Sequence, residues 1–120
     1  MGVSLFPILP NSGRKLIRMA SNLGGADHAE LRAGVLTLLL EQSEPWPESD
    51  PTSELMPRIV RCLAAIESGE AQRFAPEAKS FRITVIYHDD PPGEVTRALE
   101  RVRLEQQGRA EVVWHPDRPG

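Results

Sequence analysis

Apolar residues recur at helical spacing in the N-terminal half of the chain and in strand-like runs near its C-terminus. A first helix is predicted to follow the N-cap candidates Asn11 and Ser12 and to stop at Gly24 and Gly25. Its apolar positions are Leu16, Ile17, Ala20 and Leu23. A second helix is predicted from Asp27 to about Gln42, because Asp27 and Glu30 have the spacing of a capping box.

The centre of this second predicted helix, residues 35–40, is apolar nearly all round and would therefore occupy the middle of the fold. Residues 43–53 are acidic and rich in proline, which predicts a loop. A third helix should follow, with Pro57 in its first turn and Gly69 at its end. Its apolar stripe consists of Ile59, Val60, Leu63 and Ile66.

The C-terminal third predicts a strand, a helix and a second strand. Residues 81–87 are mostly β-branched or aromatic, residues 94–107 show a helical pattern, and residues 111–115 form another strand-like run. About two dozen residues separate the two strands, which is the length of a parallel crossover rather than of a hairpin. We therefore predict a right-handed βαβ unit.

These elements predict an α+β or small α/β domain, with three N-terminal helices packed on a mainly parallel sheet of two or three strands. One domain would cover residues 1–120, with a helical part at about 11–70 and the βαβ part at about 81–116. The apolar run of residues 3–9 contains Pro7, which favours an edge strand or an extended arm. A sheet this small leaves edges unpaired, and its second face could lack cover.

Composition narrows the classes of protein. Over 120 residues, 14 Lys and Arg stand against 17 Asp and Glu, for a net charge of -3, which disfavours nucleic-acid or anionic-membrane binding as the main task. The single Cys62 suits a reducing compartment. The apolar start of the chain lacks a cationic region and a small-residue cleavage site, so no signal peptide is predicted. With no stretch long enough to span a bilayer, a cytoplasmic location is expected.

Two motifs near the N-terminus invite ligand hypotheses. Residues 11–15 weakly resemble a phosphate cradle at the start of a helix, but they lack the glycine and lysine spacing of a Walker A loop, so a plain N-cap is favoured. The bases Arg14, Lys15 and Arg18 and the following turn suggest a helix-turn-helix. Asp27 and Glu30 would repel phosphates at the start of its recognition helix, so a solvated basic face is the better interpretation.

Polar side chains gather where the two predicted C-terminal strands end. Because carboxyl ends of parallel strands meet along one border of a sheet, where α/β proteins commonly bind ligands, these side chains should be neighbours. The candidate catalytic residues are His88, Asp89, Asp90, His115 and Asp117. The two histidines are also candidate ligands of a divalent metal, with neutral imidazole and carboxylate oxygens as donors. Alternatively, these residues serve turns and cap the next helix.

Trp46 stands between two prolines in the acidic loop. It could anchor a protein partner or fold back as a lid on the core, and the sequence favours neither interpretation. Cys62, beside Leu63 on a predicted helix, is interpreted as an inert packed thiol.

The leading hypothesis is a non-enzymatic protein–protein interaction module, of an adaptor, immunity-type or regulatory kind. It would bind a protein partner or a second copy through an exposed sheet edge and the Trp46 loop, without a cofactor. The alternative is a small metal-dependent or acid–base enzyme with its site at the strand ends. A nucleic-acid-binding domain is the third hypothesis.

Overall fold

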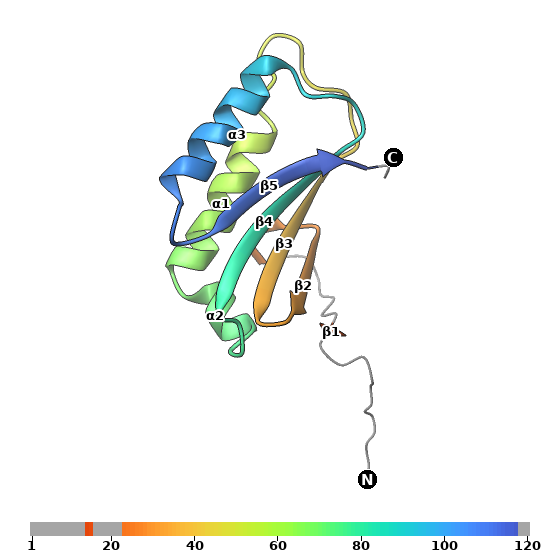
Figure 1. The fold of residues 1–120 in the computed structure, drawn as a ribbon. Helices are drawn as coiled ribbons and strands as arrows, with labels where there is room; N and C mark the ends of the chain where they lie inside the picture. Colours follow the sequence, from red (N-terminus) through yellow and green to blue (C-terminus); the bar gives the residue numbers. More distant parts are fainter. Residues whose placement is uncertain (1–13, 16–22, 118–120) are drawn as a thin grey trace.

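The computed structural model describes residues 14–15 and 23–117 of the chain. Four strands, β2 (His28–Arg32), β3 (Val35–Gln42), β4 (Ser80–Tyr87) and β5 (Glu111–Pro116), form a mixed sheet in sequence order. The short strand β1 (Arg14–Lys15) extends the sheet beside β2. Strand β2 is antiparallel to β3, whereas β3, β4 and β5 are mutually parallel (Figure 1). The α+β class predicted from the sequence is confirmed.

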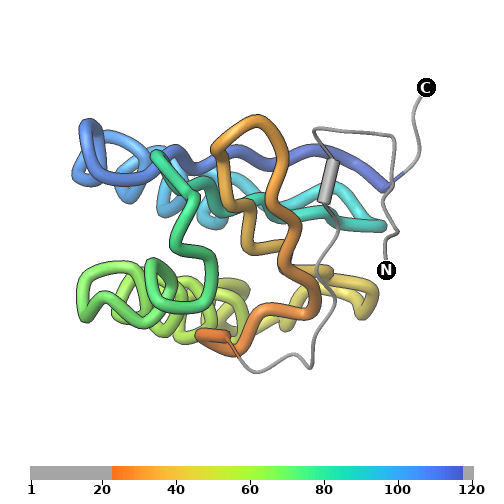
Figure 2. Tube along the Cα trace, turned by 90° about the horizontal axis from the view of Figure 1, so that it is seen from below, coloured from red at the N-terminus to blue at the C-terminus, as the bar shows by residue number. Residues whose placement is uncertain are grey.

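The βαβ unit is confirmed. Strand β4 pairs in parallel with β5, and helix α3 (Gly93–Glu105) connects them. Its N-terminal half-turn follows two prolines, and the chain leaves it through Gly108, whose φ of 87° suits a glycine. A second parallel crossover, from β3 to β4, runs through helices α1 (Leu55–Glu67) and α2 (Glu70–Phe74). Figure 2 follows this order from the orange hairpin to the blue β5.

The helix predicted from Asp27 to Gln42 is wrong, because this segment forms the hairpin of β2 and β3. Both turn residues have positive φ, 54° at Ala33 and 82° at Gly34, which is typical of a type I′ hairpin turn. The run that looked apolar all round is a strand next to another buried strand. Burial alternates along β3, but Val35 and Leu39 on the half-buried face are apolar too, so alternation is weak in the sequence.

The other helix predictions have mixed outcomes. The third predicted helix is confirmed as α1, and Gly69 with a φ of 88° separates it from α2, which the sequence did not predict. The first predicted helix is wrong at both described ends, because Arg14–Lys15 lie in β1 and Leu23–Gly25 form the 3₁₀ turn η2. The predicted architecture, three N-terminal helices on a sheet of two or three strands, is therefore wrong: β2–β5 form a sheet of four strands, and α1 and α2 connect β3 to β4. The predictions for residues 3–9, Asn11, Ser12 and Arg18 lie outside the described residues.

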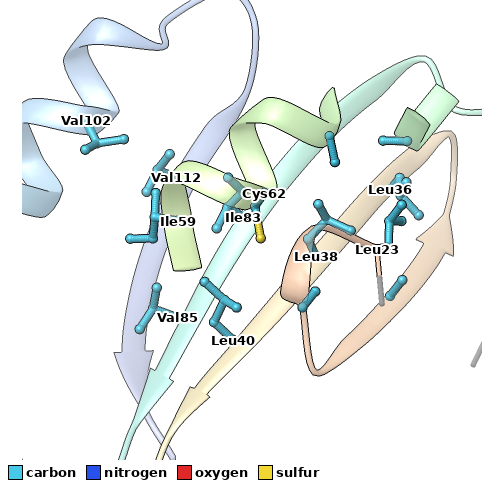
Figure 3. Packing of buried hydrophobic residues seen from close by; sticks show 14 of the residues in the cluster. Leu23, Leu36, Leu38, Leu40, Ile59, Cys62, Ile83, Val85, Val102 and Val112 are labelled. Carbon is cyan, nitrogen blue, oxygen red and sulfur yellow. The ribbon is translucent and has the colours of Figure 1, made fainter. Parts of the chain in front are cut away.

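The core lies between one face of the sheet and the helices (Figure 3). Parallel register aligns Leu38 with Ile83, and Ile83 with Val112, in one apolar row across three strands. Helix α1 buries Leu55, Ile59, Cys62 and Ala65 in this core, and α3 buries Val95, Leu99 and Val102. Burying a large apolar side chain contributes roughly 1.5–3 kcal/mol, so this layer is the main source of stability.

The opposite face of the sheet, called here the open face, carries the alternate residues of each strand. The helices of both crossovers lie on the core side (Figure 1), and no helix within residues 23–117 covers the open face. Its apolar residues Val35, Leu39, Ile86 and Val113 are half-buried, in contrast to the fully buried Leu38 and Ile83 behind them. The other members on β2–β5 are His28, Glu30, Arg32, Thr37, Glu41, Ser80, Arg82, Thr84, Glu111 and His115.

Candidate functional site

The carboxyl ends of β3, β4 and β5 lie along one border of the sheet. The segments that leave the strands there, residues 43–54, 88–92 and 117, are called the C-terminal rim. Backbone bonds continue the ladders into it, since His88 N–H donates to the Gln42 carbonyl at 3.2 Å and Asp117 N–H donates to the Tyr87 carbonyl at 2.8 Å. The ladder therefore positions both side chains.

His88 and Asp117 are neighbours, as the parallel strands predict. The His88 Nε2 atom lies 3.3 Å from Asp117 Oδ2, and the two side chains are 53% and 49% exposed. An imidazole beside a carboxylate can exchange protons with a bound molecule near neutral pH. Both groups are well solvated, so each can also exchange protons with water.

The other predicted site residues do not converge. His115 is exposed in β5, and its Nδ1 lies 3.2 Å from the Pro116 carbonyl oxygen. The Asp89 and Asp90 side chains are exposed, and neither caps α3, whose N-cap residue is Pro92 without a side-chain hydrogen bond. Among the described residues, no group of three or more His, Cys, Asp or Glu side chains could hold a metal ion. The metal prediction for His88 and His115 therefore stays a prediction without a third ligand.

Trp46 joins two loops of the rim. Its indole Nε1 donates a hydrogen bond to the Asp89 carbonyl oxygen at 2.8 Å, and its half-buried ring packs against the core cluster. This packing is what we expect if Trp46 folds back as a lid on the core. Beneath it, the buried Gln42 donates through Nε2 to the Glu44 carbonyl at 3.1 Å, which fixes the start of the same loop.

The rim is acidic. Its described segments contain Asp and Glu but no Lys or Arg. The Asp and Glu residues concerned are Glu44, Glu48, Asp50, Glu54, Asp89, Asp90 and Asp117. An excess of negative charge at one end of the sheet favours cationic groups in any molecule that binds there.

The open face has a regular arrangement that the sequence analysis did not find. Its central row contains Leu39, Thr84 and Val113, which are partners in register. One row toward the hairpin turn, Arg82 Nε pairs with Glu111 Oε1 at 2.8 Å. One row toward the rim, Ile86 lies between Glu41 and His115. An apolar centre with charged borders is typical of a protein contact surface.

A second missed feature links the hairpin to α1. The Asp27 carboxylate accepts hydrogen bonds at 2.7 Å from the Glu41 N–H and from Arg58 Nη2. Arg58 Nη1 also donates to the Glu41 carbonyl at 3.1 Å. Asp27 thus fastens the hairpin to the helix instead of capping one. The ion pair joins residues 31 positions apart, so no local pattern indicates it.

Cys62 belongs to the core. Its thiol lies 3.5 Å from the Gly24 carbonyl oxygen, and desolvation by burial raises its pKa from the usual 9.0 to about 11. A buried thiol that resists ionisation is a poor nucleophile. The interpretation of Cys62 as a packed, inert residue agrees with this environment.

Comparison with known proteins identifies no relative: no protein family, no curated protein and no solved structure matches this chain.

Proposed function

We propose that this domain is a protein–protein interaction module whose contact surface is the open face of the sheet. The observation that carries the proposal is the one-sided cover of the sheet by the helices of residues 23–117, with α1 and α3 on the core face (Figure 1). Sheets with parallel strands are normally covered on both faces, because their side chains are apolar on both. A half-exposed apolar centre therefore favours a partner as the second cover.

The residues of the open face support contact with a protein rather than catalysis. Leu39, Ile86 and Val113 offer apolar contact area, and the ion pair of Arg82 and Glu111 borders them. Apolar centres with polar borders are the common arrangement in protein interfaces. The sequence-based contact hypotheses were the Trp46 loop and an exposed sheet edge. Trp46 already bonds Asp89, so its contribution to partner binding stays a prediction.

The test compares two matched substitutions in the full-length chain. Ile86→Arg places a charge on the open face, whereas Val60→Arg places one on the outer surface of α1, where Val60 is 58% exposed. Each immobilised variant is challenged with an extract of the cells that make the protein, and retained proteins are quantified by mass spectrometry. We expect Ile86→Arg to lose proteins that the wild type and Val60→Arg both retain. Equal retention by all three would contradict the proposal.

A second candidate function is acid–base catalysis at the rim, favoured by the His88 and Asp117 pair. A pair that acts in catalysis would give any activity of the purified protein a pH dependence that His88→Gln removes. The matched control is His115→Gln, since His115 has no carboxylate partner among residues 23–117. An activity that both substitutions leave unchanged would exclude this function for the pair.

None of the helices within residues 23–117 has the length and apolar character needed to cross a bilayer.

A further inference from the structure

We propose that the partner of the open face is a second copy of this chain, packed face to face with its strands antiparallel to those of the first. This inference rests on the proposed function and names its partner. It follows from how charge is distributed along the strands, which selects one of the two simple symmetric packings of two sheets.

The open face is electrically polar along its strands. Along β2–β5, Arg32 and Arg82 lie in the half toward the hairpin turn, where Glu30 and Glu111 accompany them. The other half carries Glu41 and leads into the C-terminal rim. The described segments of the rim contain Asp and Glu but no Lys or Arg. The half toward the hairpin turn thus carries both arginines and glutamates, whereas the half toward the rim is negatively charged.

Most homodimers have two-fold symmetry, in which one patch contacts its own copy. If the axis runs along the strands, the rim of one copy faces the rim of the other, and like charges repel. If the axis runs across the strands, the arginine end of each copy faces the rim end of the other. In the second packing Arg82 of each copy lies near Glu41 of the other, and complementary charge of this kind selects register and orientation.

An axis along the row of Leu39, Thr84 and Val113 puts this row against itself, so that Leu39 and Val113 form its apolar contacts, while His28 continues the row on β2. The neighbouring rows then exchange partners. Glu111 of each copy comes opposite the second copy's His115, and Arg82 comes opposite its Ile86, with Glu41 on the adjoining strand. Sheets pack about 10 Å apart, a distance that arginine and glutamate side chains together can bridge. Each charged contact occurs twice.

This packing also satisfies needs of the single domain. It covers the half-buried residues Val35, Leu39, Ile86 and Val113, which the helices of residues 23–117 do not cover. Arg82 keeps its 2.8 Å contact with Glu111 and gains a second carboxylate. A guanidinium offers several donors in a fixed fork, so it can bond two carboxylates at once.

The test is a reciprocal charge reversal, followed by sedimentation velocity of the full chain over a range of concentrations. Arg82→Glu and Glu41→Arg each place like charges across the interface twice. We expect a dimeric wild type, and a dimer dissociation constant at least about tenfold higher for each variant alone. An equimolar mixture of both variants restores opposite charges at both contacts, so it should dimerise like the wild type.

The matched control is Arg103→Glu on α3, because Arg103 also pairs with a nearby carboxylate, Glu100, at 2.7 Å, but lies away from the open face. It should leave the dimer unchanged, and circular dichroism of each variant verifies the fold. A monomeric wild type, a dimer insensitive to both reversals, or a mixture that stays monomeric would each overturn the proposal.

The outcomes also separate this inference from the proposed function. A monomeric wild type whose captured proteins are lost in Ile86→Arg would keep the open face as a contact surface and exclude the second copy. A monomer without such capture would contradict both. A dimer that the reversals dissociate and the mixture restores supports both.

Discussion

Trp46 and Asp89, which are 43 residues apart in the chain, are joined by a 2.8 Å hydrogen bond from the indole Nε1 to the backbone carbonyl. The bond ties the loop between β3 and α1 to the loop between β4 and α3. Two prolines flank Trp46, and two more precede α3. The bond therefore joins two proline-stiffened loops of the rim.

Replacing Trp46 should separate its bond from its packing. We expect Trp46→Phe to lower the free energy of unfolding by about 1 kcal/mol, because it removes the hydrogen bond and keeps most of the ring contact. Trp46→Ala should cost about 2 kcal/mol or more, since the half-buried ring is also lost. Urea unfolding followed by circular dichroism measures both. Equal stability of Trp46→Phe and wild type would show that the bond contributes nothing.

Gly24 is predicted to tolerate no side chain. A Cβ atom there would lie 2.9 Å from Cys62 Cα and 3.0 Å from the Arg61 carbonyl oxygen, at a φ of 64°. The control is Gly108→Ala, with a similar φ of 87° and no atom within 4 Å of the added Cβ. The control should cost about 1 kcal/mol for its backbone conformation. Gly24→Ala should cost clearly more in the same unfolding experiment, and equal losses would contradict the close contact of η2 with α1.

Cys62 should make stability fall at alkaline pH. Burial raises the pKa of its thiol from 9.0 to about 11, so the folded state holds the proton more tightly than the unfolded chain. Its contribution is fully present below about pH 9 and is lost as pH rises through 11, with a size of about 3 kcal/mol. The measurement is the difference in unfolding free energy between wild type and Cys62→Ala at several pH values. A difference that stays constant from pH 8 to about 11 would disprove the shift.

Asp27 and Arg58 should be energetically coupled. Their 2.7 Å pair is part-buried, with side chains 38% and 22% exposed, and Asp27 also accepts the Glu41 N–H. A double-mutant cycle of Asp27→Ala and Arg58→Ala should give a coupling of about 1 kcal/mol, because charge-assisted bonds strengthen away from water. The exposed pair of Arg103 and Glu100 provides the comparison and should couple less. The opposite order would contradict a structural role for Asp27.

The sequence predicted the parts of the fold that depend on local signals and connection length. The β-branched residues of β4, the turn at Pro91 and Pro92 and the helical pattern of α3 led to the parallel βαβ unit. The same geometry correctly placed His88 beside Asp117. Both results follow because two parallel neighbouring strands need a crossover connection, and a helix with short loops has the right length for one.

The hairpin was missed because its signals are weak. Ala33 and Gly34 form the turn, without the Asn-Gly or Asp-Gly pair that usually indicates one. Leu39 is apolar although it lies on the open face, so alternation along β3 is disguised. The open face itself depends on which strands pair, and the pairing of β3 with β4 joins residues more than 40 positions apart. No pattern within either segment reveals it.

The most direct test of the open face is thiol labelling of single cysteines introduced at Thr37, Leu38 and Leu39, in dilute protein where self-association does not compete. Thr37 and Leu39 lie half-buried on the open face, whereas Leu38 is fully buried against the helices. The account predicts fast labelling of Thr37→Cys and Leu39→Cys and slow labelling of Leu38→Cys, comparable to that of Cys62. Labelling of Leu39→Cys as slow as that of Leu38→Cys would contradict a face that no helix of residues 23–117 covers.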